Sequence, residues 1–385
     1  MDKDTLFSAF GKWVAPINPN IIPNWQSTTT LDRYVKKLDT LVFLYIFIEA
    51  QLEKRKGLRS IMRKLEHDEE FQKQLGIASI SASQLSRKNN QLDPEVLQAI
   101  LCNLITQLHR DARPVSGRIG TVKIIDSSTI SVCLQRYKWA TFRKTKAGVK
   151  LHLRVAFADP DHVYPDKAVV TPARPADRSQ MDVLIDESDV TYLMDRGYLD
   201  YGKYDSYCER GIRFVSRLKD NAVVEEVEEL SVNTDSDIIR DVKVVLGKAH
   251  KRMQHPLRMI VTTDGRGNEV RIITNRFDLT AEELGDLYRS RWQIEMFFRW
   301  VKQNLKLTCF YGDSENAVMN QIWICLIAYC LLLLMKVELG TSRTLTELIE
   351  ALKELMWQPW LRMVAAVERK PSRTSRGRQK KQKDQ

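Results

Sequence analysis

The sequence lacks the cysteine pairs that a structural zinc site or a redox dithiol needs. None of its six cysteines is spaced C-x-x-C with another, and that spacing supplies two of the ligands in common zinc sites. Several cysteines lie in apolar segments, where cysteine packs as a small hydrophobic residue. We therefore expect free thiols and a reducing compartment.

The sequence also lacks a long apolar segment. Its first residues, MDKDTLFSAFGKW, contain no uninterrupted apolar core of a secretory signal. The longest apolar run, residues 322–335, has fourteen residues, whereas a helix needs about 20 to cross a bilayer. We expect this run to form a core helix. We also expect a cytoplasmic, nucleoid-associated protein with no membrane partner.

A nucleotide-phosphate loop is absent as well. Gly265 and Gly267 lie in a short polar segment that no helix follows, and no G-x-x-x-x-G-K-[S/T] motif occurs. The sequence therefore gives no sign that ATP drives its chemistry.

Acidic residues are scarce at the C-terminal end. Between residues 369 and 385, eight Lys or Arg face only Asp384, a net +7 of the +11 that the chain carries. Such a tail is either a solvated, disordered end or an arm that contacts phosphates. The excess of positive charge makes a polyanion the first partner to consider.

The first 115 residues have helical periodicity. Residues 31–54 predict one long helix or two helices. Within residues 80–105, a Ser-x-x-Gln capping pattern precedes a short helix, and Asp93-Pro94 opens another. Arg87 and Lys88 lie near the junction, as they would in a DNA-reading helix pair, although a plain helical hairpin has the same pattern.

After residue 117 the pattern becomes that of an α/β sheet with packed helices. Strands are expected at 121–134, 149–159, 190–195 and 212–218, and helices near 179–187, 201–210, 316–339 and 345–357. Residues 219–276 contain acidic, strand-like pieces and a hairpin around residues 264–268. We interpret them as an inserted β-rich segment rather than a continuation of the sheet.

Three carboxylates stand out. Asp126 and Asp195 each follow a short apolar, β-branched or aromatic run, and a charge at the end of a buried strand is costly without a partner. Glu295 lies in residues 288–302, where Tyr288, Arg291, Glu295 and Lys302 fall within roughly 60° on a helical wheel. Taken alone, each aspartate is explained as a cap of the segment that follows it. The stripe formed by Tyr288, Arg291, Glu295 and Lys302 is explained as a row of ion pairs on a helix surface. Together, the three acids suit Mg²⁺, which prefers oxygen ligands.

These blocks resemble a known family. Tyr288-x2-Arg291-x3-Glu295-x6-Lys302 resembles the Tyr-Arg-Glu-Lys signature of bacterial insertion-sequence DDE transposases of the IS-four family. Ile-Ile-Asp126-Ser-Ser-Thr and Leu-Met-Asp195-Arg-Gly-Tyr resemble its two aspartate blocks. The inserted segment between Asp195 and Glu295 also matches, and the resemblance spans about residues 116–340.

The resemblance implies an α/β, RNase H-like mixed sheet with flanking helices, a β-rich insertion and an all-α N-terminal domain. Asp126, Asp195 and Glu295 would be both the catalytic residues and the ligands of Mg²⁺, with Mn²⁺ able to substitute. Tyr288, Arg291 and Lys302 would contact DNA near the scissile phosphate. The implied enzyme binds terminal inverted repeats, acts on double-stranded transposon-end and target DNA as a homodimer, and moves its element by cut-and-paste.

The resemblance is incomplete in two places. Many relatives carry a His-Asp pair where this chain has Ala176-Asp177, which leaves the role of Asp177 open. The insertion contains no Trp or Tyr, so no residue there is assigned to stack a displaced base. Trp292 is able to stack a base but at its position is more typical of a core, and His152 is more typical of a hydrogen-bonded strand histidine than of a metal neighbour.

The same residues leave two other functions open: a DNA-binding protein that has lost catalysis, and a metal-dependent nuclease without strand transfer.

The predicted organisation has six parts. They are a helical DNA-binding domain (1–115), the catalytic core in two parts (116–218 and 277–340), the β-rich insertion (219–276), a C-terminal helical region (341–368) and the basic tail (369–385).

Overall fold

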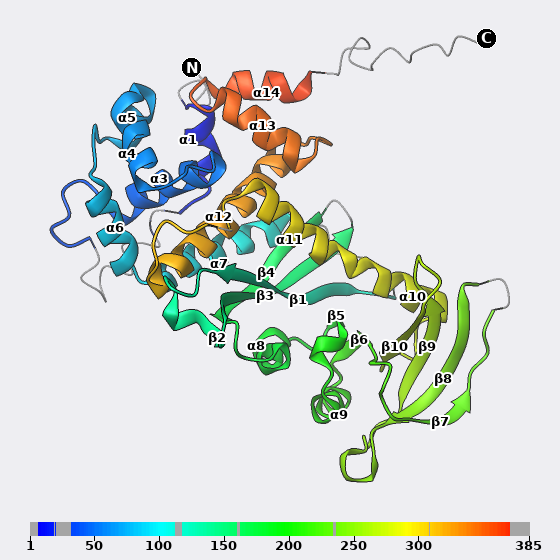
Figure 1. The fold of residues 1–385 in the computed structure, drawn as a ribbon. Helices are drawn as coiled ribbons and strands as arrows, with labels where there is room; N and C mark the ends of the chain where they lie inside the picture. Colours follow the sequence, from blue (N-terminus) through cyan, green and yellow to red (C-terminus); the bar gives the residue numbers. More distant parts are fainter. Residues whose placement is uncertain are drawn as a thin grey trace, which may run out of the picture.

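The computed structural model describes residues 7–18, 20, 32–111, 118–159, 162–233, 236–307 and 309–369. Helices from both ends of the chain gather above one long mixed sheet (Figure 1). The basic tail lies outside the described residues except for Arg369. All six cysteines lie in described segments and are free thiols, as expected.

The N-terminal segment is helical, as its periodicity predicts. The capping box at Ser81 and Gln84 is formed, and Pro94 opens the following helix. The helix expected over 31–54 begins only at Thr40, because Asp39 caps it by accepting from the Val42 N–H at 2.7 Å. The helices are α1 (Ala9–Val14), α3 (Thr40–Leu52), α4 (Leu58–His67), α5 (Glu69–Leu75), α6 (Ala82–Gln91) and α7 (Pro94–Asp111).

The first six strands have the order and directions of an RNase H-like sheet. Strand β1 pairs antiparallel with β3 and parallel with β5, β3 pairs antiparallel with β4, and β5 pairs parallel with β6. The strands are β1 (Thr121–Val132), β2 (Thr141–Arg143), β3 (Lys146–Asp159), β4 (His162–Pro172), β5 (Val190–Met194) and β6 (Arg213–Arg217). The connections contain η2 (Lys138–Ala140), η3 (Asp177–Gln180), α8 (Met181–Leu184), η4 (Arg196–Tyr198) and α9 (Tyr201–Glu209).

The β-rich insertion continues this sheet, which corrects the expectation of a separate segment. Strand β10 pairs antiparallel with β6, and the sheet of ten strands runs in the order β2-β3-β1-β5-β6-β10-β9-β8-β7, with β4 on β3. The physical reason is that β6 would otherwise be an apolar edge with unpaired backbone groups. The added elements are β7 (Val224–Glu229), β8 (Ile238–Leu246), η5 (Ala249–Lys251), β9 (Leu257–Thr263) and β10 (Glu269–Thr274).

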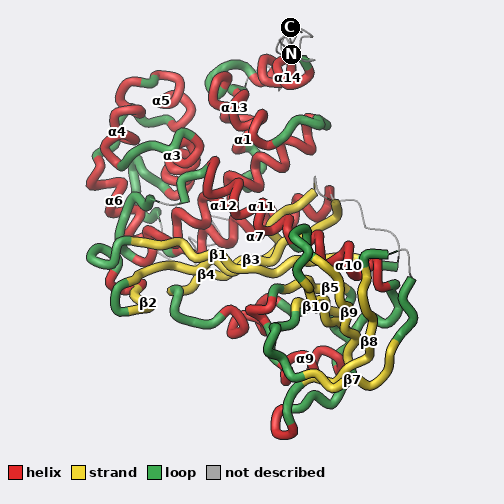
Figure 2. The backbone as a smooth tube through the Cα atoms, turned by 45° about the vertical axis from the view of Figure 1, so that its right-hand side comes forward, coloured by secondary structure: helices red, strands yellow, loops and turns green. Residues whose placement is uncertain are grey.

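One apolar helix joins the N-terminal helices to the sheet. Helix α12 (Glu315–Leu339) lies between the sheet and the helices α3 and α6 (Figure 2). Among the described residues it is the one helix long and apolar enough to cross a membrane, but 78% of its apolar window is buried within the protein. The other late helices are α10 (Ala281–Ser290), α11 (Trp292–Asn304), α13 (Leu345–Leu355) and α14 (Trp360–Glu368).

A buried arginine ties the end of the insertion to the start of the central strands. The side chain of Arg276 is 1% exposed. Its guanidinium donates to the carbonyl oxygens of Arg118 (2.8 Å) and Ile119 (3.2 Å), to the Thr191 hydroxyl, and to Asp278. Because residues 118 and 119 precede β1 and Thr191 lies in β5, Arg276 sets the relative position of these two strands.

Candidate active site

Two predicted carboxylates come from neighbouring parallel strands. Ile125 of β1 pairs with Met194 of β5, and both side chains are buried in the same core cluster. Because side chains alternate along a strand, the residues that follow, Asp126 and Asp195, emerge on the other face of the sheet. The register therefore places these two carboxylates beside each other.

Asp126 lies within β1, which confirms the strand expected over residues 121–134 and corrects the interpretation of Asp126 as an acid at a strand end. Strand β1 continues for six residues to Val132, with β3 as its partner throughout. The pairing with β5 stops at Ile125, because β5 ends at Met194. Asp126 is thus the first residue of β1 beyond the pairing with β5, and its side chain remains 21% exposed.

The segment 288–302 is two helices rather than one. Helix α10 ends at Ser290, α11 begins at Trp292, and Arg291 between them keeps helical angles (φ −53°, ψ −28°). The Arg291 Nη2 atom is 2.5 Å from Glu295 Oε1, and Nη1 is 3.7 Å from Asp126 Oδ2. Arg291 therefore links the carboxylate on α11 to the carboxylate on β1.

The two other members of the predicted stripe lie on either side of Arg291. The Arg291 guanidinium is 5.8 Å from the centre of the Tyr288 ring, and burial raises the pKa of the Tyr288 phenol to about 12. Lys302 Nζ donates to Ser128 Oγ at 2.6 Å, and burial lowers the pKa of Lys302. The stripe thus faces β1 from Asp126 to Ser128.

The acids of this site are crowded. Burial raises the pKa of Asp126 to about 6, and repulsion from Asp195 and Glu295 adds to the effect. The Ser127 N–H, which donates to Asp126 Oδ1 at 2.7 Å, and the Arg291 guanidinium act in the opposite direction. The ionised form of Asp126 is therefore disfavoured in the folded protein unless a cation offsets the cost of its burial.

The donor set fits a divalent cation together with a phosphate. Three carboxylates are hard oxygen donors of the kind Mg²⁺ prefers. Buried polar atoms that find no partner among the described residues surround them: the Tyr198 hydroxyl and Nε of Arg217 and Arg291. In the described part of the chain, however, no three His, Cys, Asp or Glu side chains lie close enough to share an ion, and Glu295 is paired with Arg291.

A polar network behind Asp126 was missed from the sequence. Asp177 Oδ1 accepts from Ser127 Oγ at 2.6 Å and from Lys150 Nζ at 3.0 Å, and it lies 3.6 Å from Nδ1 of His152. His152 is buried and is 3.0 Å from Thr171 Oγ1, which confirms it as a hydrogen-bonded strand histidine. The histidine beside Asp177 is therefore His152 of β3 and not a residue at position 176. The Ala176-Asp177 sequence alone does not indicate this contact.

Asp177→Asn should lower DNA cleavage about 10- to 100-fold with little change in DNA affinity, as expected when a residue that orients a ligand is changed. Asp177 holds Ser127, and Ser127 holds Asp126. Cleavage rate and equilibrium binding of the same duplex give the measurement. Asp182→Asn is the matched control, since Asp182 is an exposed acid on α8 whose only described ion pair is with Lys203. Equal loss in both variants would contradict the role of Asp177.

His152 gives the fold a predictable dependence on pH. Burial lowers its pKa to about 4, whereas an unfolded histidine has a pKa near 6.5. The unfolded state therefore binds the proton first, and stability falls as pH decreases from about 6.5 towards 4. Chemical unfolding at pH 7 and pH 5 should show that the wild type loses about 2 kcal/mol more than His152→Gln. An identical pH dependence in the two proteins would refute this.

Arg87 and Lys88 lie on α6, away from the carboxylates. Arg87 is exposed. Lys88 forms an ion pair with Asp32 and is 14% exposed, so it is less available to DNA than Arg87. Trp292, expected in the core, is instead 49% exposed on α11, with the Arg299 guanidinium 5.9 Å from its ring centre.

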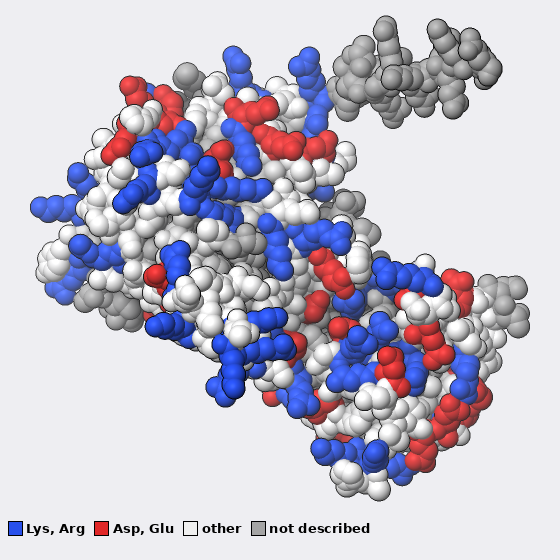
Figure 3. Space-filling model, in the orientation of Figure 1, with Lys and Arg blue, Asp and Glu red and all other residues white. Residues whose placement is uncertain are grey.

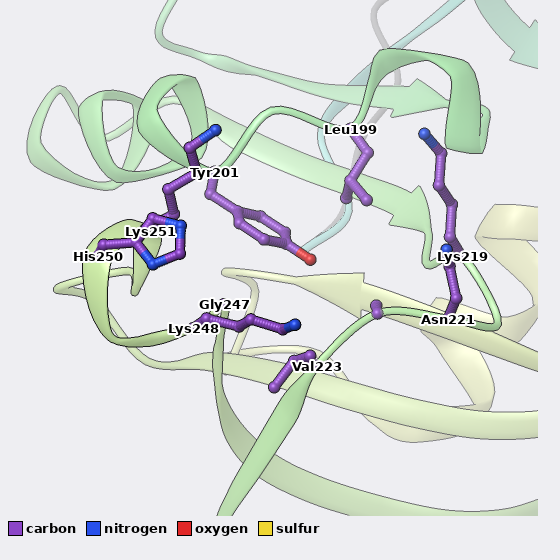
Figure 4. A pocket seen from close by; sticks show the side chains of 10 residues that line it. Leu199, Tyr201, Lys219, Asn221, Val223, Gly247, Lys248, His250 and Lys251 are labelled. Atoms are coloured by element: carbon purple, nitrogen blue, oxygen red, sulfur yellow. The ribbon is translucent and has the colours of Figure 1, made fainter.

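A cavity of about 220 Å³ lies between the start of α9 and the loops of the insertion (Figure 4). Tyr201 faces it from one side, and Lys219 and Lys248 from the other. None of the three carboxylates lines it, so it is separate from the site described above.

Comparisons with known proteins indicate the family of this chain. A family model described as "Transposase DDE domain" matches residues 118–331, and one described as a domain of unknown function matches residues 6–78. A probable transposase for insertion sequence element IS5377 of Geobacillus stearothermophilus is 30% identical over 75% of this chain and 74% of its own length. A putative transposase for insertion sequence element IS4SA of a Synechocystis strain is 22% identical over 90% of this chain and 98% of its own length.

Among solved structures, a piggyBac transposase synaptic complex with hairpin DNA has a TM-score of 0.47 and 8% identity, covering 94% of this chain and 81% of that one. The family model spans more than half of the chain and includes all three carboxylates and the Tyr-Arg-Glu-Lys stripe. The chain belongs to the DDE transposases of insertion-sequence elements, which implies an enzyme of DNA transposition.

Proposed function

We propose that this transposase binds the terminal inverted repeats of its own insertion sequence and moves it by a cut-and-paste route. The observation that carries the proposal is the contact of Arg291 with both Asp126 and Glu295, next to the strand register that sets Asp195 beside Asp126. Arg291 and Glu295, far along the chain from Asp126, thus lie next to it.

In this mechanism Asp126, Asp195 and Glu295 would hold Mg²⁺, and Mn²⁺ could substitute for it. Membership of the DDE family implies such a divalent metal. A pair of ions supplies activation of a water or a 3′-hydroxyl and stabilisation of the leaving oxygen. Arg291, which now pairs with Glu295, would bind the DNA phosphate, and Glu295 would then be free to act as a ligand with the two aspartates. Tyr288 and Lys302 hold the same DNA backbone, through a hydroxyl and a charge-assisted hydrogen bond.

Other parts of the chain supply affinity. Exposed Arg87, with Lys88, contacts DNA from α6, and the basic tail adds nonspecific attraction to phosphates. Two copies join both ends of the element as a homodimer and transfer the 3′-OH ends to double-stranded target DNA. We place this activity in the cytoplasm, at the nucleoid.

Incubation of the purified protein with Mg²⁺ and the DNA that flanks its own gene tests the proposal. Cleavage at the element ends, followed by joined products, is expected. Binding without cutting would instead identify a DNA-binding protein without catalysis, and cutting without joined products would identify a nuclease. Inverted repeats and a short target duplication in the flanking DNA are expected as well.

A further inference from the structure

A strongly basic hairpin lies beyond the catalytic part of β1. Residues 127–158 contain seven Lys or Arg and no Asp or Glu. Five of these cations lie on η2, β2 and the adjoining turns and are exposed: Arg136, Lys138, Arg143, Lys144 and Lys146. Figure 3 shows Lys and Arg side chains gathered, with few acidic ones, around and below the place of β2 in Figure 1.

These cations differ from the other cations of the same strands. Lys123 and Arg154 are buried and form ion pairs with Asp166 and Glu187. On the hairpin, only Arg136 has a carboxylate within 4.0 Å among the described residues, and that pair with Asp313 is exposed at 3.8 Å. The charges of the hairpin therefore stabilise the fold less than the buried ion pairs of Lys123 and Arg154 do. They remain available to a partner.

The hairpin is held in a fixed position. Trp139 Nε1 donates to the Asp313 carbonyl at 2.8 Å, and the Tyr137 hydroxyl lies 3.4 Å from the Gly312 carbonyl oxygen. Phe142 lies so close over Gly148 that a Cβ there would be 3.2 Å from its ring. A surface held in this way presents its charges at a defined distance from the active site.

Strand β1 sets that distance. Val132, the last residue of β1, pairs with Ala147, so Lys146 is level with a point seven residues beyond Asp126. At about 3.3 Å per residue this is about 23 Å, or six to seven base pairs at about 3.4 Å each. Between the two points β1 carries the hydroxyls of Ser127, Ser128, Thr129 and Ser131, and Lys302 lies on Ser128.

We propose that the hairpin formed by η2, β2 and the start of β3 is a second DNA-contact surface. It binds the backbone of the duplex about six to seven base pairs from the scissile phosphate, through Arg143, Lys144 and Lys146. This inference rests on the proposed function and extends it, because it fixes which part of the transposon end or its flank lies along β1. The contacts are to phosphates, so they set position and carry no base sequence.

The test uses the full chain and a duplex that contains one element end with its flank. The variant is R143A/K144A/K146A. A matched control, K251A/R266A/R362A, removes three exposed charges from distant parts of the surface. Affinity is measured as a function of salt, and contacts are mapped by hydroxyl-radical footprinting. All these side chains are exposed, and thermal unfolding checks that each variant folds like the wild type.

For the hairpin variant we expect a salt-dependence slope smaller by about two to three and an affinity lower by at least 10-fold at low salt. Protection should be lost about six to seven base pairs from the cleavage site and retained at the site itself. The control should keep the wild-type footprint. An unchanged footprint and slope, or loss of protection at a different distance, would overturn the inference. If the wild type neither binds nor cuts the end, the proposed function itself has failed.

Discussion

Asp126→Asn should abolish strand cleavage, with a loss of about a thousand-fold or more, while binding of the element end stays nearly unchanged. A carboxylate that holds a catalytic cation is worth several kcal/mol in the transition state, and each 1.4 kcal/mol is about tenfold in rate. The asparagine still accepts from the Ser127 N–H, so the local backbone is preserved. Single-turnover cleavage and equilibrium binding of one duplex are the two measurements.

The same substitution should leave the protein at least as stable as the wild type. It removes a charge whose burial is the largest cost and which Asp195 and Glu295 repel, and this gain offsets the lost attraction to Arg291 at 3.7 Å. Asp182→Asn changes the net charge equally at an exposed position and should retain cleavage. If Asp126→Asn lost binding and cleavage in equal measure, or unfolded, the role of Asp126 as a metal ligand would be wrong.

Arg276→Met should destabilise the fold by about 3 kcal/mol and reduce cleavage although Arg276 touches none of the three catalytic carboxylates. The buried guanidinium satisfies two backbone carbonyls and the Thr191 hydroxyl, and hydrogen bonds from a charged donor contribute about 1.5–3 kcal/mol each. Its loss also frees the start of β1 from β5, the two strands that position Asp126 and Asp195. Denaturant unfolding and cleavage assays measure both effects.

Arg271→Met is the matched control for this prediction. Arg271 lies on β10 only five residues away, and its partners are Glu269, at 3.3 Å and well exposed, and the Asp220 carbonyl. Exposed pairs contribute about 0–1 kcal/mol, so this variant should remain close to the wild type. A similar loss of stability in both variants would mean that the buried hydrogen bonds of Arg276 stabilise the fold no more than the exposed contacts of Arg271.

The sequence was informative about the site because its chemistry is carried by short, ordered blocks. Short apolar runs up to Ile125 and Met194 located both aspartates, and helical spacing grouped Glu295 with Arg291 and Lys302. The strand expected over residues 121–134 agrees with β1, but the sequence did not show that the pairing of β1 with β5 stops at Ile125 while its pairing with β3 continues. Those partnerships are set by tertiary structure.

The same limit explains the other differences. The continuity of the insertion with the sheet depends on backbone pairing between β6 and β10, and no side-chain pattern encodes which edge a distant hairpin joins. The boundary between α10 and α11 falls at Arg291, which keeps helical angles, so no helix-breaking residue in the sequence marks it. The Asp177 network joins β1, β3 and η3, and a histidine 25 residues away supplies what position 176 lacks.

The position of α12 has a consequence for synthesis. This helix is made late, yet the N-terminal helices and the catalytic sheet belong to one apolar cluster that includes it. At about 5–20 residues per second, roughly 15–60 s separate the emergence of α3 from that of α12. During that interval the nascent polypeptide exposes apolar surface that only α12 covers. A ribosome that stops before Leu339 therefore releases a product with no complete core and no cutting activity.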